Sequence, residues 1–380
     1  MTDDCQVPID NDPRRTTHPQ PRRASGCRFQ WVLAVTVIQW IPWSLCMIAV
    51  AQDRVIMQQP GGSRFPITGI VDDYTGREVT VLVRAGEQLR RYPRQEVVEV
   101  QTAYTAHHER GRQLLAKGQP SQAKPELTLA LKEEDRIWVR RLILSELVRC
   151  ALWEGDYRAA VPNFLSIVES DPETMHFGLV PLAWTERAAD ANVKFEANAW
   201  LTDSSLVAQL IGASHLLFDG EENDRAETVL RRLARESNIR LQRLAQMQLW
   251  RVRSVGGIAT PGELLRWEVA VDDLPEELRA GGYYVLGQTF RRQQQPERAA
   301  AALLWLPLVY DADRHLAARA CFEAAELVES FGDQAQATNL YSEVVFRFGD
   351  TPPAAKAEAK WKQLRGESVE PKANRKDPAR

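Results

Sequence analysis

The hydrophobic positions of the chain take on the spacing of an α-helix from about residue 103. A small residue is repeatedly followed, four and seven positions later, by apolar ones, so the small and apolar side chains share one helix face. Successive alanines of this pattern are 37, 66, 73 and 38 residues apart. Such a period predicts helical hairpins that stack, because one hairpin cannot bury its apolar face alone. The five units are Ala123/Leu127/Ala130, Ala160/Phe164/Ile167, Ala226/Leu230/Leu233, Ala299/Leu303/Leu306 and Ala337/Tyr341/Val344.

The two middle gaps are close to twice the outer ones. One degenerate unit in each gap would restore a single period, and we expect these units around residues 178–201 and 254–274. The expected helical part therefore spans residues 103–365, with five well-defined units and two weak ones.

The residues around the predicted inter-helix turns resemble those of the tetratricopeptide repeat (TPR) family. Gly155 and Asp156 stand at one turn, and Ala160 and Phe164 follow at the matching positions of the next helix. Glycine at such a turn permits a positive φ. The resemblance implies a mainly α fold, a TPR-like α-solenoid of antiparallel hairpins whose concave face binds a protein or peptide. Further matches are Tyr283, Leu286, Gly287 and Phe290 in one unit and Phe331, Gly332, Asp333, Ala337 and Tyr341 in another.

The last unit and the helix expected after it are similar to the ending of exported bacterial helical-repeat proteins. That stretch runs from Tyr341 through Pro352 and Pro353 to Leu364. Residues 366–380 are polar and contain proline, a composition with too few apolar side chains to form a core. We expect them to be a disordered tail.

A different pattern precedes the helices. Residues 64–100 contain the β-branched runs 67–71, 79–83 and 97–100, separated by turn-forming aspartates and glycines. Three or four short strands in so few residues predict a small β-rich, SH3-like module. It could bind peptides or nucleic acid, or it could cap the first helix pair. Residues 52–63 are expected to be a linker.

The first 51 residues have the pattern of an export signal. Residues 29–51 are mostly apolar and follow five arginines. Ala49 and Ala51 form the small-x-small ending of a signal peptide that would be cleaved before Gln52. The alternative is an uncleaved anchor, because about 20 apolar residues can cross a bilayer. Both interpretations place residues 52–380 in the periplasm or cell envelope, with membrane contact only through the retained anchor.

Composition narrows the class of partner. The 48 basic and 51 acidic residues give a net charge of −3, whereas nucleic-acid-binding proteins usually have a basic face. No nucleic-acid partner is therefore expected.

No two of the five cysteines have CxxC spacing, which argues against zinc and redox motifs. Cys150 and Cys321 lie in separate predicted helices and are expected to be buried thiols.

Catalytic motifs are also absent from the sequence. It contains no G-x-S-x-G elbow, P-loop or dinucleotide-binding glycine fingerprint. His107 and His108 are adjacent, so their side chains point about 100° apart on a helix, and no second histidine follows at the spacing of a helical zinc site. We therefore expect no catalytic residue, no metal site and no cofactor.

The resemblance to TPR proteins implies which side chains line a concave face. An aromatic and arginine mixture at these positions is the composition favoured at binding hot spots. The leading hypothesis is therefore an exported, non-catalytic scaffold for protein–protein interaction. The alternative is a structural or assembly factor anchored in the cell envelope. The candidate groove residues are Ser145, Arg149 and Trp153 in one unit and Tyr284, Gln288, Arg291 and Arg292 in another.

Overall fold

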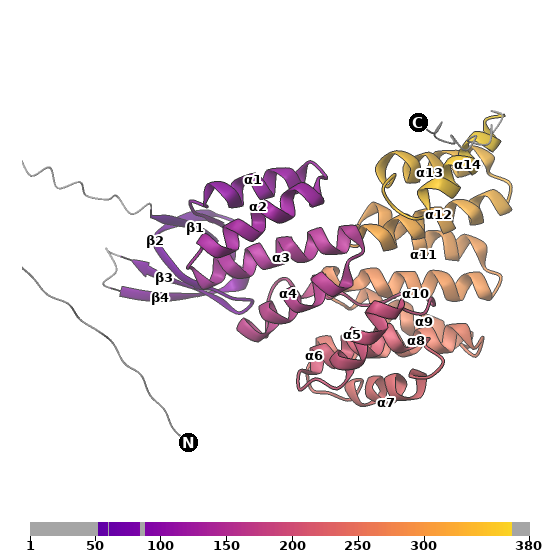
Figure 1. The fold of residues 1–380 in the computed structure, drawn as a ribbon, viewed down its shortest axis with the longest axis horizontal. Coiled ribbons are helices and arrows are strands. Elements are labelled where there is room, and N and C mark those ends of the chain that lie inside the picture. Colours follow the sequence, from indigo (N-terminus) through magenta and orange to yellow (C-terminus); the bar gives the residue numbers. More distant parts are fainter. Residues whose placement is uncertain (1–51, 60, 84–87, 367–380) are drawn as a thin grey trace, which may run out of the picture. The chain divides into compact units, whose positions relative to one another are not determined.

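The computed structural model describes residues 52–59, 61–83 and 88–366, in which a small antiparallel β-sheet is followed by fourteen α-helices (Figure 1). The expected fold class, mainly α with a β-rich module before the helices, is confirmed at this level. The strands are β1 Asp53–Gln58, β2 Arg64–Tyr74, β3 Glu78–Val83, β4 Gln88–Pro93 and β5 Val97–Gln101.

The strand order of the sheet is β4-β3-β2-β1-β5. The first half of β2 pairs with β1, whereas its second half, from Ile70, pairs with β3. One long strand thus belongs to both halves of the sheet. A single 3₁₀ turn, Arg94–Glu96, joins β4 to β5.

The prediction of a linker at residues 52–63 was wrong. Most of that segment is strand β1, which lies between β2 and β5. Alternate side chains of β1 are buried, and Val55 and Met57 are fully enclosed. The alternation was present in the sequence, but the nearby Pro60 and Gly61 suggested a linker. Strand β4 was also not predicted, because its polar residues are almost all exposed at the sheet edge.

The helices follow one another in close pairs from residue 106 onward. They are α1 Ala106–Ala116, α2 Pro120–Glu133, α3 Ile137–Glu154, α4 Tyr157–Ser170, α5 Ala191–Leu201, α6 Leu206–Leu216, α7 Asn223–Leu233, α8 Ile239–Val255, α9 Pro261–Asp272, α10 Arg279–Arg292, α11 Pro296–Leu308, α12 Arg314–Ser330, α13 Gln334–Arg347 and α14 Ala354–Leu364.

The alanine pattern marks the second helix of five hairpins. The alanines lie in α2, α4, α7, α11 and α13, and each packs against the helix before it. All fifteen side chains of the five units are fully buried. The pattern therefore located the core side of these helices correctly.

Two glycines explain how closely the paired helices approach. A Cβ added to Gly111 of α1 would lie 2.6 Å from the side chain of Leu127 in α2. A Cβ added to Gly287 of α10 would lie 2.6 Å from the side chain of Leu303 in α11. The same contact therefore recurs in two hairpins that are far apart in sequence. Each leucine occupies the space that any larger residue would need.

The two weak units differ from the expected hairpins. Residues 171–190 form an irregular segment with one 3₁₀ turn, Phe177–Leu179, and only α5 follows within the range 178–201. Between 254 and 274 the chain forms the end of α8 and a complete helix, α9. A capping box between Thr260 and Glu263 begins α9.

The sheet and the first three helices share one hydrophobic core. Val55, Val79 and Val81 of the sheet belong to the same buried cluster as Leu127 of α2 and Ile143 of α3. The indole Nε1 of Trp138 in α3 donates a hydrogen bond to the Val71 carbonyl, at 3.2 Å. The β-rich module is thus packed onto the start of the helical part.

Some predictions concern residues outside those that the structure describes. They are the signal or anchor at 1–51, with Ala49 and Ala51, and all but the first residue of the tail at 366–380. Gln52 is described and exposed. Within the described ranges no helix is both long and apolar enough to cross a bilayer. The prediction of two separate buried thiols is confirmed, because Cys150 and Cys321 are both free and fully enclosed.

Candidate functional site

A pocket of about 600 Å³ opens where α3 faces the connection between α11 and α12. Segments distant in sequence form its wall: α1, α3, the irregular segment, the 3₁₀ turn Glu276–Leu278, and the α11–α12 connection. Its lining residues are Arg112, Leu142, Ser145, Glu146, Arg149, Met175, His176, Gly178, Leu179, Glu276, Glu277, Val309, Tyr310, Asp311 and Ala312.

Direct contacts join the end of α3 to the start of α12. His315, at the start of α12, places its Nε2 2.9 Å from the carbonyl oxygen of Trp153, at the end of α3. The Trp153 indole donates to Asp350 at 2.9 Å, and the guanidinium of Arg314 lies 4.8 Å from its ring centre. These contacts join residues more than 150 positions apart. Tertiary contacts therefore hold the end of α3 against the start of α12.

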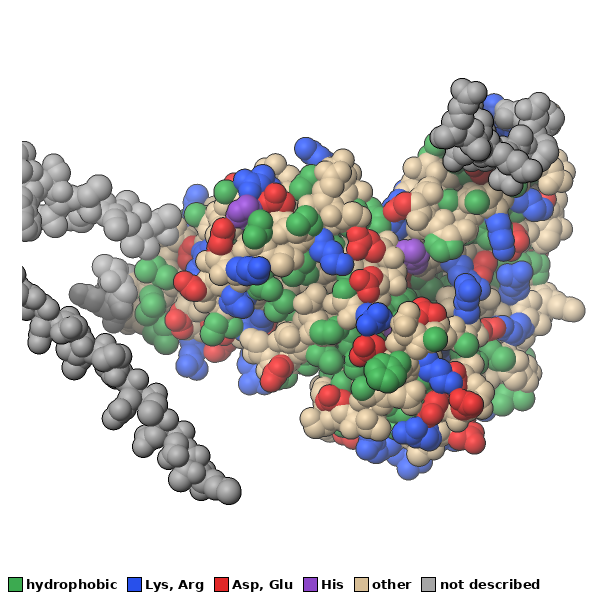
Figure 2. All heavy atoms as spheres, viewed as in Figure 1, with side chains coloured by type: hydrophobic (Ala, Val, Ile, Leu, Met, Phe, Trp, Pro, Cys, Tyr) green, Lys and Arg blue, Asp and Glu red, His purple; other side chains and the backbone are tan. Residues whose placement is uncertain are grey.

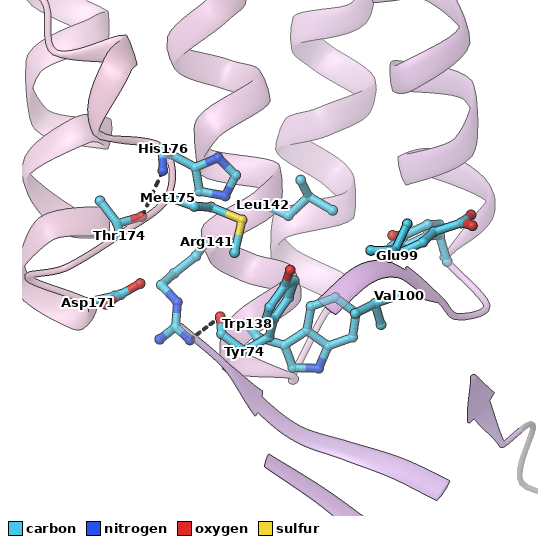
Figure 3. Close-up of a pocket in the computed structure, with 12 residues that line it drawn as sticks. Tyr74, Glu99, Val100, Trp138, Arg141, Leu142, Asp171, Thr174, Met175 and His176 are labelled. Atoms are coloured by element: carbon cyan, nitrogen blue, oxygen red, sulfur yellow. Dashed lines mark hydrogen bonds between the residues drawn. The ribbon is translucent and has the colours of Figure 1, made fainter. Parts of the chain in front are cut away.

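A smaller pocket of about 180 Å³ lies between α3 and the sheet (Figure 3). Tyr74, Tyr104 and Trp138 supply aromatic walls. Leu142, Met175 and His176 line both pockets, so the two pockets adjoin. We call the two adjoining pockets, defined by the lining residues of both, the α3 groove.

His176 lies where the two pockets meet. Figure 3 shows its ring beside Met175 and Leu142. Burial, together with the nearby cations Arg149 and Arg141, lowers the pKa of His176 to about 4. The imidazole is therefore neutral near pH 7, with one nitrogen that donates and one that accepts a hydrogen bond. Its ring makes no hydrogen bond within the described part of the chain.

Arg141 is buried in the wall of the smaller pocket and is fully engaged. Its guanidinium donates to the Asp73 carboxylate, to Ser170 Oγ at 2.9 Å and to the Tyr74 carbonyl at 3.1 Å. These bonds satisfy a cation that would otherwise be costly to bury. Arg141 thus joins the sheet to α3 and α4.

The larger pocket carries both signs of charge. Arg112 lies 3.4 Å from Glu146, and Asp311 lies 2.6 Å from Arg347. Over the residues that the structure places, Arg149, Glu276 and Glu277 form no salt bridge. The lining of the larger pocket therefore offers one cation, Arg149, and two carboxylates, Glu276 and Glu277, with which a ligand could pair.

The first set of predicted groove residues lies in or next to the groove. Ser145 and Arg149 line the larger pocket. Ser145 is buried and its hydroxyl donates to the Leu142 carbonyl at 2.7 Å, so Arg149 is the exposed member. Trp153 does not line the pocket and instead contacts α12 and Asp350.

The second set is absent from the lining of both pockets. Tyr284 is buried, and its hydroxyl lies 3.4 Å from Glu323 in α12. Gln288 also donates to Glu323, and Arg292 pairs with Glu186 of the irregular segment. Arg291 and Arg292 are both exposed, and Arg291 lies 3.8 Å from Glu326. All four side chains therefore take part in internal contacts.

The sequence analysis did not identify the pocket residues of the irregular segment, Met175 to Leu179. The oversized gap between Ala160 and Ala226 was the available signal, together with Pro172 and Pro181, which interrupt a helical period. A degenerate repeat explained the same gap, and the sequence could not separate the two interpretations.

The lining of the α3 groove combines apolar side chains with charges of both signs. The ranges that the structure describes hold no group of three or more metal-ligating side chains. Charges of both signs alternate over the face in view in Figure 2, without the basic stripe of a nucleic-acid site. When the chain was compared with models of known protein families and with curated proteins, nothing matched.

Proposed function

We propose that this protein is an exported, non-catalytic interaction scaffold that binds a segment of a partner protein in the α3 groove. The groove itself is the observation that carries this proposal. Its mixed apolar and charged lining comes from two strands of the sheet, from α1 and α3, and from connections that are distant in sequence. Pockets with apolar walls and a few convergent polar groups are common ligand sites. Arg149, a candidate groove residue predicted from the sequence, lines this groove.

The repeat architecture supports this proposal. We infer a TPR-like solenoid from the alanine positions of five second helices and from the glycine–leucine contacts of Gly111 and Gly287. Gly155 has a φ of 71° and ends α3, and the Asp156 carboxylate caps α4. These are the turn residues on which the resemblance rests.

The strand order supports an SH3-like assignment for the β-rich module. Strands β1 to β4 form a meander, β5 returns beside β1, and a 3₁₀ turn precedes it. Because its buried face shares a core with α2 and α3, we assign it a capping role. Val98 and Glu99 of β5 line the smaller pocket, so the cap also shapes the groove.

The lining defines the chemistry of the partner. Arg149 would pair with a carboxylate, and Glu276 and Glu277 with a lysine or arginine. Leu142, Met175 and the aromatic walls of the smaller pocket would accept one apolar side chain. We therefore propose a peptide segment of mixed charge with an apolar anchor, and no nucleic acid.

Site-specific photocrosslinking tests this proposal. A photoreactive amino acid at position 309, an exposed valine that lines the larger pocket, is expected to give a discrete adduct in intact cells. The same group at position 158, an exposed arginine of α4 outside the groove, is the matched control. Arg149→Glu should abolish the adduct formed from position 309, whereas Arg158→Glu should not. Identical adducts from positions 309 and 158, or none from 309, would overturn the proposal.

The location of the protein is tested at its N-terminus. We propose cleavage after Ala51 and release into the periplasm. Mass spectrometry of the mature chain should then find Gln52 as the first residue. A mature chain that retains residues 29–51 would instead support the anchored assembly factor.

A further inference from the structure

Residues 180–186, which we call the inner segment, pass over α6, α8 and α10 without helix or strand structure. They contact these helices as a bound peptide contacts a receptor. The Ala183 amide donates to Ser214 Oγ of α6 at 3.1 Å. His215 of α6 donates from Nε2 to the Pro181 carbonyl at 3.1 Å. Backbone groups of the segment are therefore recognised by side chains of the helix.

A buried arginine of α8 binds the backbone of the inner segment near its end. The Arg251 side chain is almost fully enclosed and donates to the carbonyl oxygens of Thr185 and of Ser214. Burying a cation is costly unless it is hydrogen-bonded. The Thr185 carbonyl thus satisfies a charge that the surrounding helices leave partly unpaired.

Two side chains of the inner segment occupy separate sites along α10. The indole of Trp184 lies directly against Gly281, because a Cβ added there would be only 2.1 Å from the ring. The Glu186 carboxylate pairs with Arg292 at the other end of α10. Side chains of the segment therefore reach both the first and the last turn of α10. This face therefore accepts an aromatic side chain and, two positions later in the bound segment, a carboxylate.

We propose that the face formed by Ser214, His215, Arg251, Gly281 and Arg292 is a peptide-binding face, and that the inner segment is its intramolecular ligand. A partner of matching chemistry is an extended peptide with an aromatic residue followed two positions later by Asp or Glu. None of the five receptor residues lines the α3 groove. This face is consequently a second site, independent of the function proposed above.

Covalent attachment gives the inner segment a large advantage over any free peptide. A tethered ligand acts at an effective concentration that reaches about millimolar. The intact chain should therefore bind a free peptide weakly. Weakening the inner segment without changing the receptor residues should unmask the face.

The test uses the chain with Trp184→Ala and Glu186→Ala together. The probe is a fluorescein-labelled peptide with the sequence of residues 179–188, followed by fluorescence anisotropy. We expect the double variant to bind it about tenfold or more tightly than the unmodified chain does. A peptide with alanine at both positions should not bind. Phe195→Ala, which removes an aromatic ring that is 77% exposed on α5, should behave as the unmodified chain.

A folded double variant that binds both peptides equally, or no better than the unmodified chain, would refute the proposal. If the double variant does not fold, hydrogen exchange of the unmodified chain gives the decision. An intramolecular ligand should open locally, so the amides of residues 183–186 should exchange faster than those of α6 and α10. If the amides of residues 183–186, of α6 and of α10 all exchange with one common free energy of opening, the segment is an integral part of the core and the proposal is overturned.

Discussion

Acidification should destabilise this protein through one histidine in particular. His215 is buried in α6, where its ring makes edge contacts with Tyr157 and Trp200 at centroid distances of 4.6 and 6.0 Å. Burial lowers the pKa of its side chain to about 4 from 6.5, although the hydrogen bond to the Pro181 carbonyl partly opposes this. The folded chain therefore keeps the ring neutral down to about pH 4, whereas the unfolded chain protonates it near pH 6.5.

The sign and size of the effect follow from proton binding. Between about pH 6.5 and pH 4 the unfolded state binds more protons, so the free energy of unfolding falls as the pH falls. For one group with this shift, the loss between about pH 7 and pH 5 is about 2 kcal/mol. Carboxylates and His176 add their own pH dependence, so the contribution of His215 must be isolated by comparison with a variant.

The comparison uses urea unfolding at about pH 7, 6 and 5 for the unmodified chain and for His215→Gln. Glutamine keeps a donor for the Pro181 carbonyl but does not titrate. We expect the variant to be less stable by about 1–2 kcal/mol near pH 7, because it loses the aromatic contacts. That difference should shrink by about 2 kcal/mol at about pH 5 and can change sign.

A control separates titration from the loss of a contact. Ser214→Ala removes the hydroxyl that accepts from Ala183 and should cost about 1 kcal/mol at every pH, because serine does not titrate in this range. The reasoning about His215 fails if the stability difference between His215→Gln and the unmodified chain is the same near pH 7 and pH 5.

Two further predictions concern the helical core. Gly287→Ala places a Cβ 2.6 Å from the buried side chain of Leu303, and the overpacking cost of about 1–3 kcal/mol should outweigh the gain of about 1 kcal/mol in helix propensity. We therefore expect a lower thermal midpoint, and an unchanged or raised midpoint would contradict the packing. Leu303→Ala should cost less stability in the Gly287→Ala background than in the unmodified chain. Burial raises the pKa of the Cys150 and Cys321 thiols to about 12, so both should resist alkylation near pH 7 in the folded chain and react once the chain is unfolded. Peptide mapping by mass spectrometry measures this, and modification of either cysteine before unfolding would contradict the prediction.

The local features of the helices could be read from the sequence. The alanine and leucine spacing identified the buried side of five second helices, because a helix places residues four and seven apart on one face. Gly155 and Asp156 marked the end of α3 and the start of α4 for a similarly local reason. Each of these predictions needed only a few consecutive residues.

The candidate groove residues were predicted with less success because their environment is set by distant segments. Arg149 and Gln288 occupy comparable positions in the expected repeats, because each lies seven residues before the N-cap of the next helix, Asp156 or Gln295. Arg149 lines the α3 groove, whereas Gln288 is half-buried and donates to Glu323 of α12. No property of either residue separates the two outcomes. The difference depends on which neighbour lies over each helix.

The sequence by itself determined the class of the fold, the position of most helices and the side on which each second helix is buried. Tertiary structure decided that β1 completes the sheet, that α3 contacts α12, and that residues 180–186 cover α6, α8 and α10. The physical reason is the range of the interactions. Helical periodicity and capping act within a few residues, whereas strand pairing, the α3 groove and the binding of the inner segment join residues tens to more than a hundred positions apart.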